Sequence, residues 1–155
     1  MIFLGDQNFG KSYILNRFMN DTFTEEYQDT LGLDFQSKNV QIDGQDIHLL
    51  LYDIARKEKF RSLIPMYTRD VNIILLVYDI SSKDSFDHLP EWLRHLSNVK
   101  LDEVIFALVG NENDLEDKKE VSTEEGLKFA EENKENISLL YKLSKMTGIL
   151  YHLKK

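Results

Sequence analysis

The sequence predicts an α/β fold in which a six-stranded, mostly parallel sheet is covered by helices on both faces. Short apolar runs of β type alternate with helical patterns from end to end, as expected for parallel strands joined by crossover helices. The second apolar run is split by Asp43-Gly44, a dipeptide that favours a tight hairpin turn, so one strand is expected to be antiparallel. A chain of 155 residues is long enough for one domain with its own core, and we expect a single domain over residues 1–155.

The expected strands follow from the apolar runs, and the second run contains both arms of the hairpin. These runs are Met1 to Leu4, Val40 to Tyr52, Ile73 to Tyr78, Val104 to Val109 and Ile137 to Tyr141. Helices are predicted after Lys11, over Phe86 to Leu96, and over Glu124 to Asn133, where the capping pattern Ser122-Thr123-Glu124-Glu125 opens the helix. The first strand and the last helix, which contains Ile149, Leu150 and Leu153, are short. We therefore expect the chain to be short at both ends.

Composition argues against several classes of site. The sequence has no cysteine, which excludes a disulfide, a thiolate metal site, a thiol nucleophile and a prenylation acceptor within these residues. A formal net charge of -8 repels nucleic acid and anionic lipid, so we expect no nucleic-acid partner and no membrane contact from this segment. No apolar run approaches the roughly 18 residues of a transmembrane helix. We expect a cytoplasmic protein.

A phosphate-binding loop follows the first strand directly. Its sequence is Gly5-Asp6-Gln7-Asn8-Phe9-Gly10-Lys11-Ser12, which fits the pattern G-x-x-x-x-G-K-[ST] and opens a helix. The glycines let backbone N–H groups turn toward an anion, Lys11 supplies a mobile positive charge, and the hydroxyl of Ser12 is a ligand for Mg²⁺. The alternative is a glycine turn before a helix whose lysine is a solvated surface charge. We expect residues Gly5 to Ser12, with Tyr13, to bind nucleotide phosphates.

Beyond this loop, the chain resembles the small GTPases of the Ras superfamily, and in particular the Rab type. The stretch Tyr27 to Phe35 is similar to switch I of a Rab protein, and Lys59 to Pro65 and Leu76 to Ile80 are similar to Rab stretches after switch II. Phe60 to Pro65 looks most like the Golgi-associated branch. The resemblance implies a three-layer P-loop G domain that binds GTP and GDP with Mg²⁺ and works as a switch in vesicle trafficking.

Motif positions then imply individual roles around the metal and the nucleotide. Ser12, Thr30 and Asp53 would hold Mg²⁺, and Thr30 would also reach the γ-phosphate in the GTP state. Phe23 would stack on the base, and Tyr27 would lie over the phosphates. Taken alone, a strand aromatic is more often a core residue and a single threonine more often a turn residue. The ordered set of motifs favours the functional interpretation.

Two later segments resemble the loops that read guanine. Gly110-Asn111-Glu112-Asn113-Asp114 is similar to N-K-x-D, in which Asp114 would accept hydrogen bonds from the base and Asn111 would tie this loop to the phosphate loop. Adenine lacks that donor pair, and a buried carboxylate without donors is costly, so such sites discriminate by about 10⁴ or more. Leu143-Ser144-Lys145 is similar to the S-A-K loop, whose backbone N–H faces the guanine oxygen and whose lysine flanks the base, which implies that Ser144 and Lys145 bind the nucleotide. Ordinary loop capping is the alternative for Asn111 and Asp114.

The resemblance also implies a protein-binding surface. Phe35, Tyr52 and Tyr67 occupy the positions of the aromatic triad that Rab effectors read, with Tyr52 in place of the more usual tryptophan. We therefore expect effector and regulator proteins to bind through switch I, switch II and these three residues. If the chain has a lipidated tail outside this segment, the cytosolic face of Golgi or vesicle membranes is the expected location.

The chain departs from the family at the residues that hydrolyse GTP. Switch II normally begins D-x-A-G-Q, and here Arg56 and Lys57 replace the glycine and the glutamine. A charged lysine accepts no hydrogen bond and therefore cannot align the attacking water as an amide does. Losing a positioned catalytic group costs about 10² to 10⁴ in rate. Arg56 or Lys57 could alternatively supply positive charge to the transferring phosphoryl group, as an arginine finger does. Lost or altered hydrolysis is the commoner result of two such substitutions, so we assign no catalytic residue.

Two further departures affect the base. Glu112 replaces the lysine whose stem covers the guanine, and Leu143 replaces a supporting serine, so weaker guanine affinity is expected. Three functions follow: a guanine-nucleotide switch with little or no intrinsic hydrolysis, a working GTPase assisted by a partner, and a nucleotide-free interaction module, or pseudo-GTPase. The first is the main prediction. An ATP-specific enzyme is disfavoured by Asn111 and Asp114.

Overall fold

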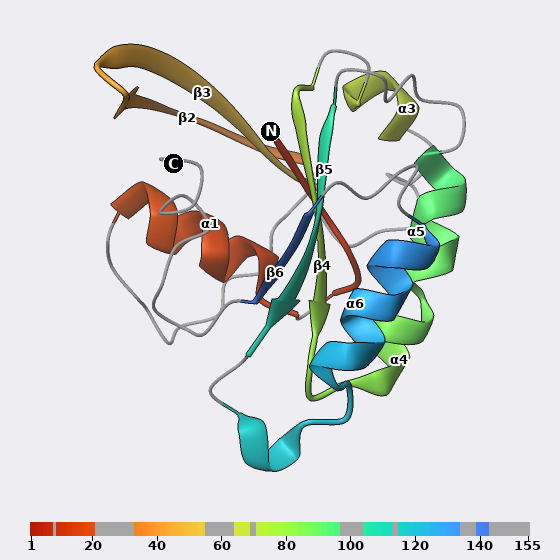
Figure 1. Cartoon of the computed structure of the whole chain (residues 1–155). Coiled ribbons are helices and arrows are strands. Elements are labelled where there is room, and N and C mark those ends of the chain that lie inside the picture. The colour runs from red at the N-terminus through yellow and green to blue at the C-terminus, as the bar shows by residue number, and fades with distance from the viewer. Residues whose placement is uncertain are drawn as a thin grey trace.

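The computed structural model describes residues 1–7, 9–20, 33–54, 64–68, 71–96, 104–112, 115–133 and 139–142. These residues form a six-stranded sheet with the order β2-β3-β1-β4-β5-β6. Only β2 runs antiparallel to its neighbour β3, and the other pairings are parallel. Helices lie on both faces of the sheet (Figure 1). The predicted fold class, a mostly parallel sheet between two helical layers, is confirmed.

The element bounds are as follows. The strands are β1 Ile2–Leu4, β2 Leu33–Ile42, β3 Gln45–Ile54, β4 Ile73–Asp79, β5 Ile105–Asn111 and β6 Leu139–Lys142. The helices are α1 Lys11–Asn20, α3 Ile64–Tyr67, α4 Lys83–Asp87, α5 Leu89–Leu96 and α6 Thr123–Glu132, with a 3₁₀ turn, η1, at Glu116–Lys118. None of the helices among the described residues is long and apolar enough to cross a membrane.

The strand alternation produces two apolar clusters, one on each face of the sheet. Along β4, Ile74, Leu76 and Tyr78 pack on the cluster shared with α4, α5 and α6. The intervening Leu75 and Val77 pack on the other face, where α1 lies (Figure 1). Parallel strands covered on both faces are expected to be apolar at every position, and five consecutive residues of β4 are buried.

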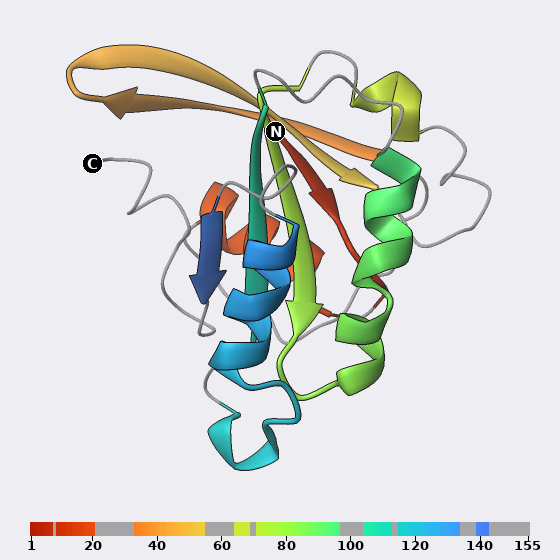
Figure 2. The same ribbon diagram turned by 45° about the vertical axis from the view of Figure 1, so that its right-hand side comes forward.

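The hairpin is longer than predicted. Its first arm begins at Leu33 rather than Val40, because β2 pairs with β3 over its whole length, from Leu33 opposite Ile54 to Ile42 opposite Gln45. This first arm alternates exposed and half-buried residues, so its sequence contains no continuous apolar run. Figure 2 shows the hairpin extending beyond the rest of the sheet.

The helical segment predicted over Phe86 to Leu96 is also different. It begins at Lys83, where the Ser82 side chain accepts a hydrogen bond from the Ser85 N–H, and it is divided at His88 into α4 and α5. The capping box predicted at Ser122 is present, with hydrogen bonds in both directions between Ser122 and Glu125. Local capping patterns were therefore more informative than apolar periodicity about where these helices begin.

A lysine joins the hairpin to α1. The Lys38 ammonium on β2 donates to the backbone carbonyls of Phe18 and Met19, the second at 3.2 Å, and lies 4.6 Å from the centre of the Phe18 ring. Carbonyls at the end of a helix lack partners within the helix and carry its partial negative charge. Lys38 therefore caps α1 and holds the hairpin beside it.

Candidate nucleotide-binding site

The phosphate loop runs between β1 and α1, and its two glycines allow the backbone to approach neighbouring elements. A Cβ added at Gly5, where φ is +132°, would lie 2.1 Å from the carbonyl oxygen of Val77 on β4. A Cβ added at Gly10, where φ is +81°, would lie 2.0 Å from the side-chain nitrogen of Asn111. Each glycine is therefore required by space as well as by backbone conformation.

The loop lysine is directed back over the loop. Lys11 is buried, with 9% of its surface exposed, and its ammonium donates a hydrogen bond to the backbone carbonyl of Asp6. The carbonyl of Gly10 accepts the first helical bond, from the N–H of Ile14 at 2.8 Å. The loop thus presents a positive charge at the start of a helix, an arrangement that suits a phosphate group.

Two of the predicted Mg²⁺ ligands meet beside the loop. Asp53, near the end of β3, is 2% exposed, and its carboxylate accepts a hydrogen bond from the hydroxyl of Ser12 on the first turn of α1. Carboxylate and hydroxyl oxygens are the ligand types that Mg²⁺ prefers. Ser12 and Asp53 therefore fit the ion in chemistry and in position, and they would hold it against a phosphate on the loop.

The segment predicted to read guanine contacts the phosphate loop. The buried Asn111, the last residue of β5, donates from its side-chain nitrogen to the carbonyl of Phe9 at 3.2 Å. The same nitrogen lies 3.4 Å from a carboxylate oxygen of Glu112, which has a φ of +61°. The Glu112 carboxylate thus lies close to Asn111, on the side of the loop that holds Gly10.

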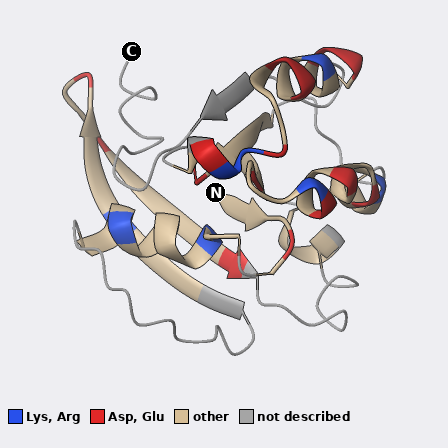
Figure 3. Cartoon of the chain, turned by 90° about the horizontal axis from the view of Figure 1, so that it is seen from below, with Lys and Arg blue, Asp and Glu red and all other residues tan. Residues whose placement is uncertain are grey.

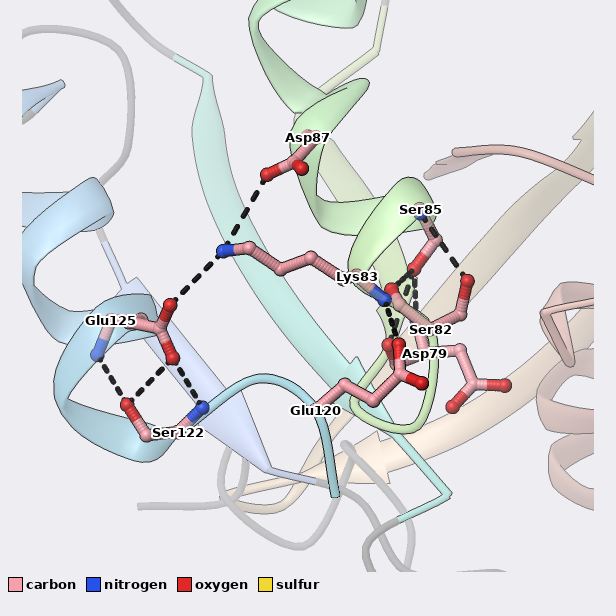
Figure 4. A network of polar contacts seen from close by, with 8 residues as sticks. All are labelled: Asp79, Ser82, Lys83, Ser85, Asp87, Glu120, Ser122 and Glu125. Atoms are coloured by element: carbon pink, nitrogen blue, oxygen red, sulfur yellow. Dashed lines mark hydrogen bonds and ion pairs between the residues drawn. The ribbon is translucent and has the colours of Figure 1, made fainter. Parts of the chain in front are cut away.

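Polar contacts from the neighbouring turn support this segment. The N–H of Ile80 donates to the carbonyl of Asn111 at 3.1 Å, and the carbonyl of Ile80 accepts from the N–H groups of Glu120 and Val121. The Lys83 ammonium bridges to Glu125 on α6 at 3.0 Å, and the Lys83 N–H donates to Glu120 at 2.8 Å (Figure 4). These contacts fix the loop after β5 to the turn after β4.

Glu125 is the most strongly perturbed carboxylate of this network. Hydrogen bonds from the Ser122 N–H, then from Lys83 and the Ser122 hydroxyl, lower its pKa from 4.5 to about 2. The same hydrogen bond to Glu125 raises the pKa of the Lys83 ammonium. The negative charge of Glu125 at the start of α6 also complements the positive end of the helix dipole.

The three aromatic residues of the expected effector surface lie together. The ring centres of Phe35 and Tyr52 are 5.5 Å apart, and those of Tyr52 and Tyr67 are 6.3 Å apart. Phe35 is 53% exposed and the two tyrosines are half-buried. Residues from β2, β3 and α3 therefore form one aromatic patch at the surface.

Several predicted site residues lie outside the described part of the chain. They are Asn8, Phe23, Tyr27, Thr30, Arg56, Lys57, Asp114, Leu143, Ser144 and Lys145. Of the residues expected to bind nucleotide, the structure places Gly5, Asp6, Gln7, Phe9, Gly10, Lys11, Ser12, Tyr13 and Asn111. It brings Ser12 to Asp53 and Asn111 to Phe9, although each pair is far apart in sequence.

Two residues that contact the loop could not be identified from the sequence: Trp92 on α5, and His88 just before α5. The indole N–H of Trp92 donates to the Asp6 carboxylate at 2.8 Å, and Nδ1 of His88 lies 2.5 Å from the other carboxylate oxygen. Trp92 is the only tryptophan in the chain and lies on the apolar side of a helix, which by itself indicates a core residue. No motif signals this contact.

Acidic and basic residues alternate on the helices and turns around this edge of the sheet (Figure 3). Figure 3 views the molecule from below, toward the ends at which β4 and β5 finish in Figure 1, with acidic residues in red. Among the described residues, no group of three or more histidine, aspartate or glutamate side chains is placed to hold a metal ion. The two oxygen ligands that the described residues offer a cation are therefore those of Ser12 and Asp53, and Thr30, the third predicted ligand, lies outside the described residues.

A comparison with protein families identifies the chain. The model of the Ras family matches residues 1–142, which include the phosphate loop, the hairpin, Asp53 and Asn111. The chain belongs to the Ras family. Ras-family proteins are small GTPases that bind GTP and GDP, typically with Mg²⁺, and interact with effectors and regulators. The convergence of phosphate loop, Ser12, Asp53 and Asn111 in this Ras-family protein agrees with a GTP-binding switch.

We expect Gly10→Ala to lower the free energy of unfolding by about 3 kcal/mol, because the methyl group meets both an unfavourable φ and the Asn111 side chain. Urea unfolding followed by circular dichroism measures this change. Adding Asn111→Ala makes room for the methyl group, and part of the loss is expected to be recovered in the double variant.

Gly44→Ala is the matched control, because Gly44 has a nearly identical φ of +78° but no atom within 4 Å of the added Cβ. Its expected loss is about 1 kcal/mol, from backbone conformation alone. Equal losses at the two positions would show that the contact between the loop and Asn111 is not tight.

Glu125→Gln is expected to change the acid sensitivity of the protein. The folded-state pKa of Glu125 is depressed, so its stabilising contribution is present above pH 4.5 and is lost as the pH falls toward about 2. The variant should be less stable than the wild type at neutral pH, and the difference should disappear toward about pH 2. Thermal unfolding at a series of pH values measures it. Glu124→Gln, which removes a negative charge at an exposed position in the same turn of α6, is the control for the loss of one charge.

Proposed function

We propose that this Ras-family protein is a Rab-type switch that binds guanine nucleotide with Mg²⁺ and hydrolyses GTP weakly or not at all by itself. The observation that carries the proposal is the pair Arg56-Lys57, which replaces the family's Gly-Gln in a Ras-family chain that retains most of the residues expected to hold the nucleotide. If a lipidated tail exists outside this segment, the proposed site of action is the cytosolic face of Golgi or vesicle membranes.

The residues expected to hold the nucleotide support the first half of the proposal. The buried Lys11 lies at the start of α1, Ser12 meets the buried Asp53, and Asn111 connects the base-reading segment to the loop. The contacts of Ser12 with Asp53 and of Asn111 with the loop join elements that are distant in sequence and converge at one edge of the sheet. Asp114, two residues after Glu112, supports guanine rather than adenine as the base.

A Rab-type effector surface is supported by sequence and by position. The stretch Thr30 to Phe35 has the Rab form T-[IL]-G-[IL]-D-F. The aromatic patch of Phe35, Tyr52 and Tyr67 presents an exposed ring beside two half-buried rings. Aromatic side chains give large contact area with few rotatable bonds, which favours protein recognition. Effectors and regulators are the proposed partners.

Weak hydrolysis follows from the chemistry of switch II. A glutamine orients the attacking water in this fold, and a protonated lysine has no acceptor with which to do so. Arginine at the preceding position brings a Cβ and a long side chain where glycine's backbone freedom is used. The intrinsic rate of Ras is already about 10⁻⁴ s⁻¹, so a further loss of about 10² or more leaves almost no turnover.

Nucleotide titration tests the binding half of the proposal. Protein stripped of bound nucleotide is titrated with GDP, GTP and ATP, each with Mg²⁺ and with a chelator, and heat of binding is recorded. We expect guanine nucleotides to bind at least about 10³-fold more tightly than ATP, and Mg²⁺ to strengthen binding. Ser12→Ala and Asp53→Ala should lose the Mg²⁺ effect and keep weaker, Mg²⁺-independent binding. Failure of every nucleotide to bind would instead favour a protein-interaction module.

The hydrolysis half is tested by restoring the family's residues. The double variant Arg56→Gly, Lys57→Gln is expected to hydrolyse bound GTP at least about 10²-fold faster than the wild type in single-turnover assays. Lys57→Met removes the charge without supplying an acceptor and serves as the control, with no gain expected. A wild-type rate equal to that of the double variant would show that another residue aligns the water.

A further inference from the structure

Asp6, the second residue of the phosphate loop, is held by two residues outside the loop. One oxygen of the Asp6 carboxylate accepts the indole N–H of Trp92 at 2.8 Å, and the other lies 2.5 Å from Nδ1 of His88. The Asp6 side chain is 15% exposed, whereas that of His88 is 55% exposed. Trp92 itself is 8% exposed and belongs to the apolar cluster on this face of the sheet.

These contacts continue to the phosphate-binding lysine. The carbonyl of Asp6 accepts the hydrogen bond from the Lys11 ammonium. Fixing the Asp6 carboxylate against α5 therefore also fixes the direction of its carbonyl, and with it one contact of Lys11. We call the contacts of Asp6 with His88 and Trp92 the clamp. Since α5 is anchored by the buried Leu89 and Leu96, the clamp connects a packed helix to the lysine of the loop.

We propose that His88 and Trp92 are positioning residues that hold Asp6 and the phosphate loop in the binding conformation, so that nucleotide affinity depends on the charge of His88. This inference rests on the nucleotide binding proposed above. The apparent nucleotide affinity is proportional to the fraction of molecules whose loop is in the binding conformation. Loss of the clamp therefore weakens binding without any change in the groups that touch the nucleotide.

The sign of the pH effect follows from the groups that face His88. The hydrogen bond and charge of Asp6 raise the pKa of His88 above its ordinary value of 6.5, and Glu91 on α5 and Asp84 on α4 act in the same direction. Below pH 6.5 the imidazolium is paired with Asp6, and the pairing is lost as the pH rises through the raised pKa. The Trp92 bond does not titrate and remains.

The first experiment measures the clamp in the absence of nucleotide. NMR titration of the ring proton of His88 in the intact chain gives its pKa directly. We expect a value above 6.5 in the wild type, and a lower value in Asp6→Asn, where the charge is removed but an oxygen remains to accept from Trp92. Equal values for His88 in the two proteins would overturn the proposal, because no ion pair would then exist.

The second experiment measures GDP affinity with Mg²⁺ from about pH 6 to about pH 9, a range that spans the titration of a histidine with a raised pKa. Wild-type affinity is expected to fall about two- to five-fold relative to His88→Asn over this range, a modest change because the pair is partly exposed. The asparagine keeps a donor without a titrating charge, so the His88→Asn profile should lack this component.

Two further variants separate positioning from general damage. Trp92→Phe removes the donor and keeps a buried ring, and it should weaken GDP binding about tenfold at every pH. His48→Asn is the matched control, since His48 is an exposed histidine on the hairpin whose Nδ1 lies 2.6 Å from Asn39, and its profile should match the wild type.

The outcomes distinguish this inference from the proposed function. If the wild type binds GDP but its profile is the same as that of His88→Asn, the clamp proposal is wrong and the nucleotide switch stands. If no nucleotide binds at any pH, both are overturned. Weaker binding by Trp92→Phe with unchanged thermal stability would support a positioning role. If Trp92→Phe does not fold, the proposal is tested by His88→Asn and Asp6→Asn, which change partly exposed side chains.

Discussion

The close approach of Asn111 to Gly10 is the constraint on which the candidate site depends. The amide of Asn111 reaches the carbonyl of Phe9 only because Gly10 has no Cβ, and Gly10 accepts the left-handed φ that turns the loop toward α1. This single contact joins the carboxyl end of β5 to the phosphate loop. It thereby sets the distance between the segment that would read a base and the loop that would hold its phosphates.

Most of the fold could be predicted from the sequence, because its signals are local. The apolar runs of β1, β4 and β5 are buried on both faces, and the capping box at Ser122 and the phosphate loop each occupy a few consecutive residues. The start of β2 could not be predicted, since its polar residues gain a strand conformation only by pairing with β3. The break at His88 could not be predicted either, because the helical pattern of the sequence continues through this residue.

The candidate site was predictable where it follows a motif and hidden where it does not. Lys11, Ser12, Asp53 and Asn111 lie in recognisable patterns, and the structure brings them to one edge of the sheet. The contact between Asp6 and Trp92 joins residues 86 positions apart, and no sequence motif contains both residues. Such long-range pairs depend on how α5 docks on the sheet, which periodicity alone does not specify.

The only tryptophan of the chain also has a practical consequence. The emission of an indole responds to the charge and hydrogen bonding around its N–H, and the Trp92 N–H is bonded to a carboxylate of the phosphate loop. The unmodified protein therefore contains a single indole fluorophore, which can be excited selectively over its tyrosines, in contact with the phosphate loop. Changes in the loop are expected to be visible in the light emitted by the native chain, in real time and without a label.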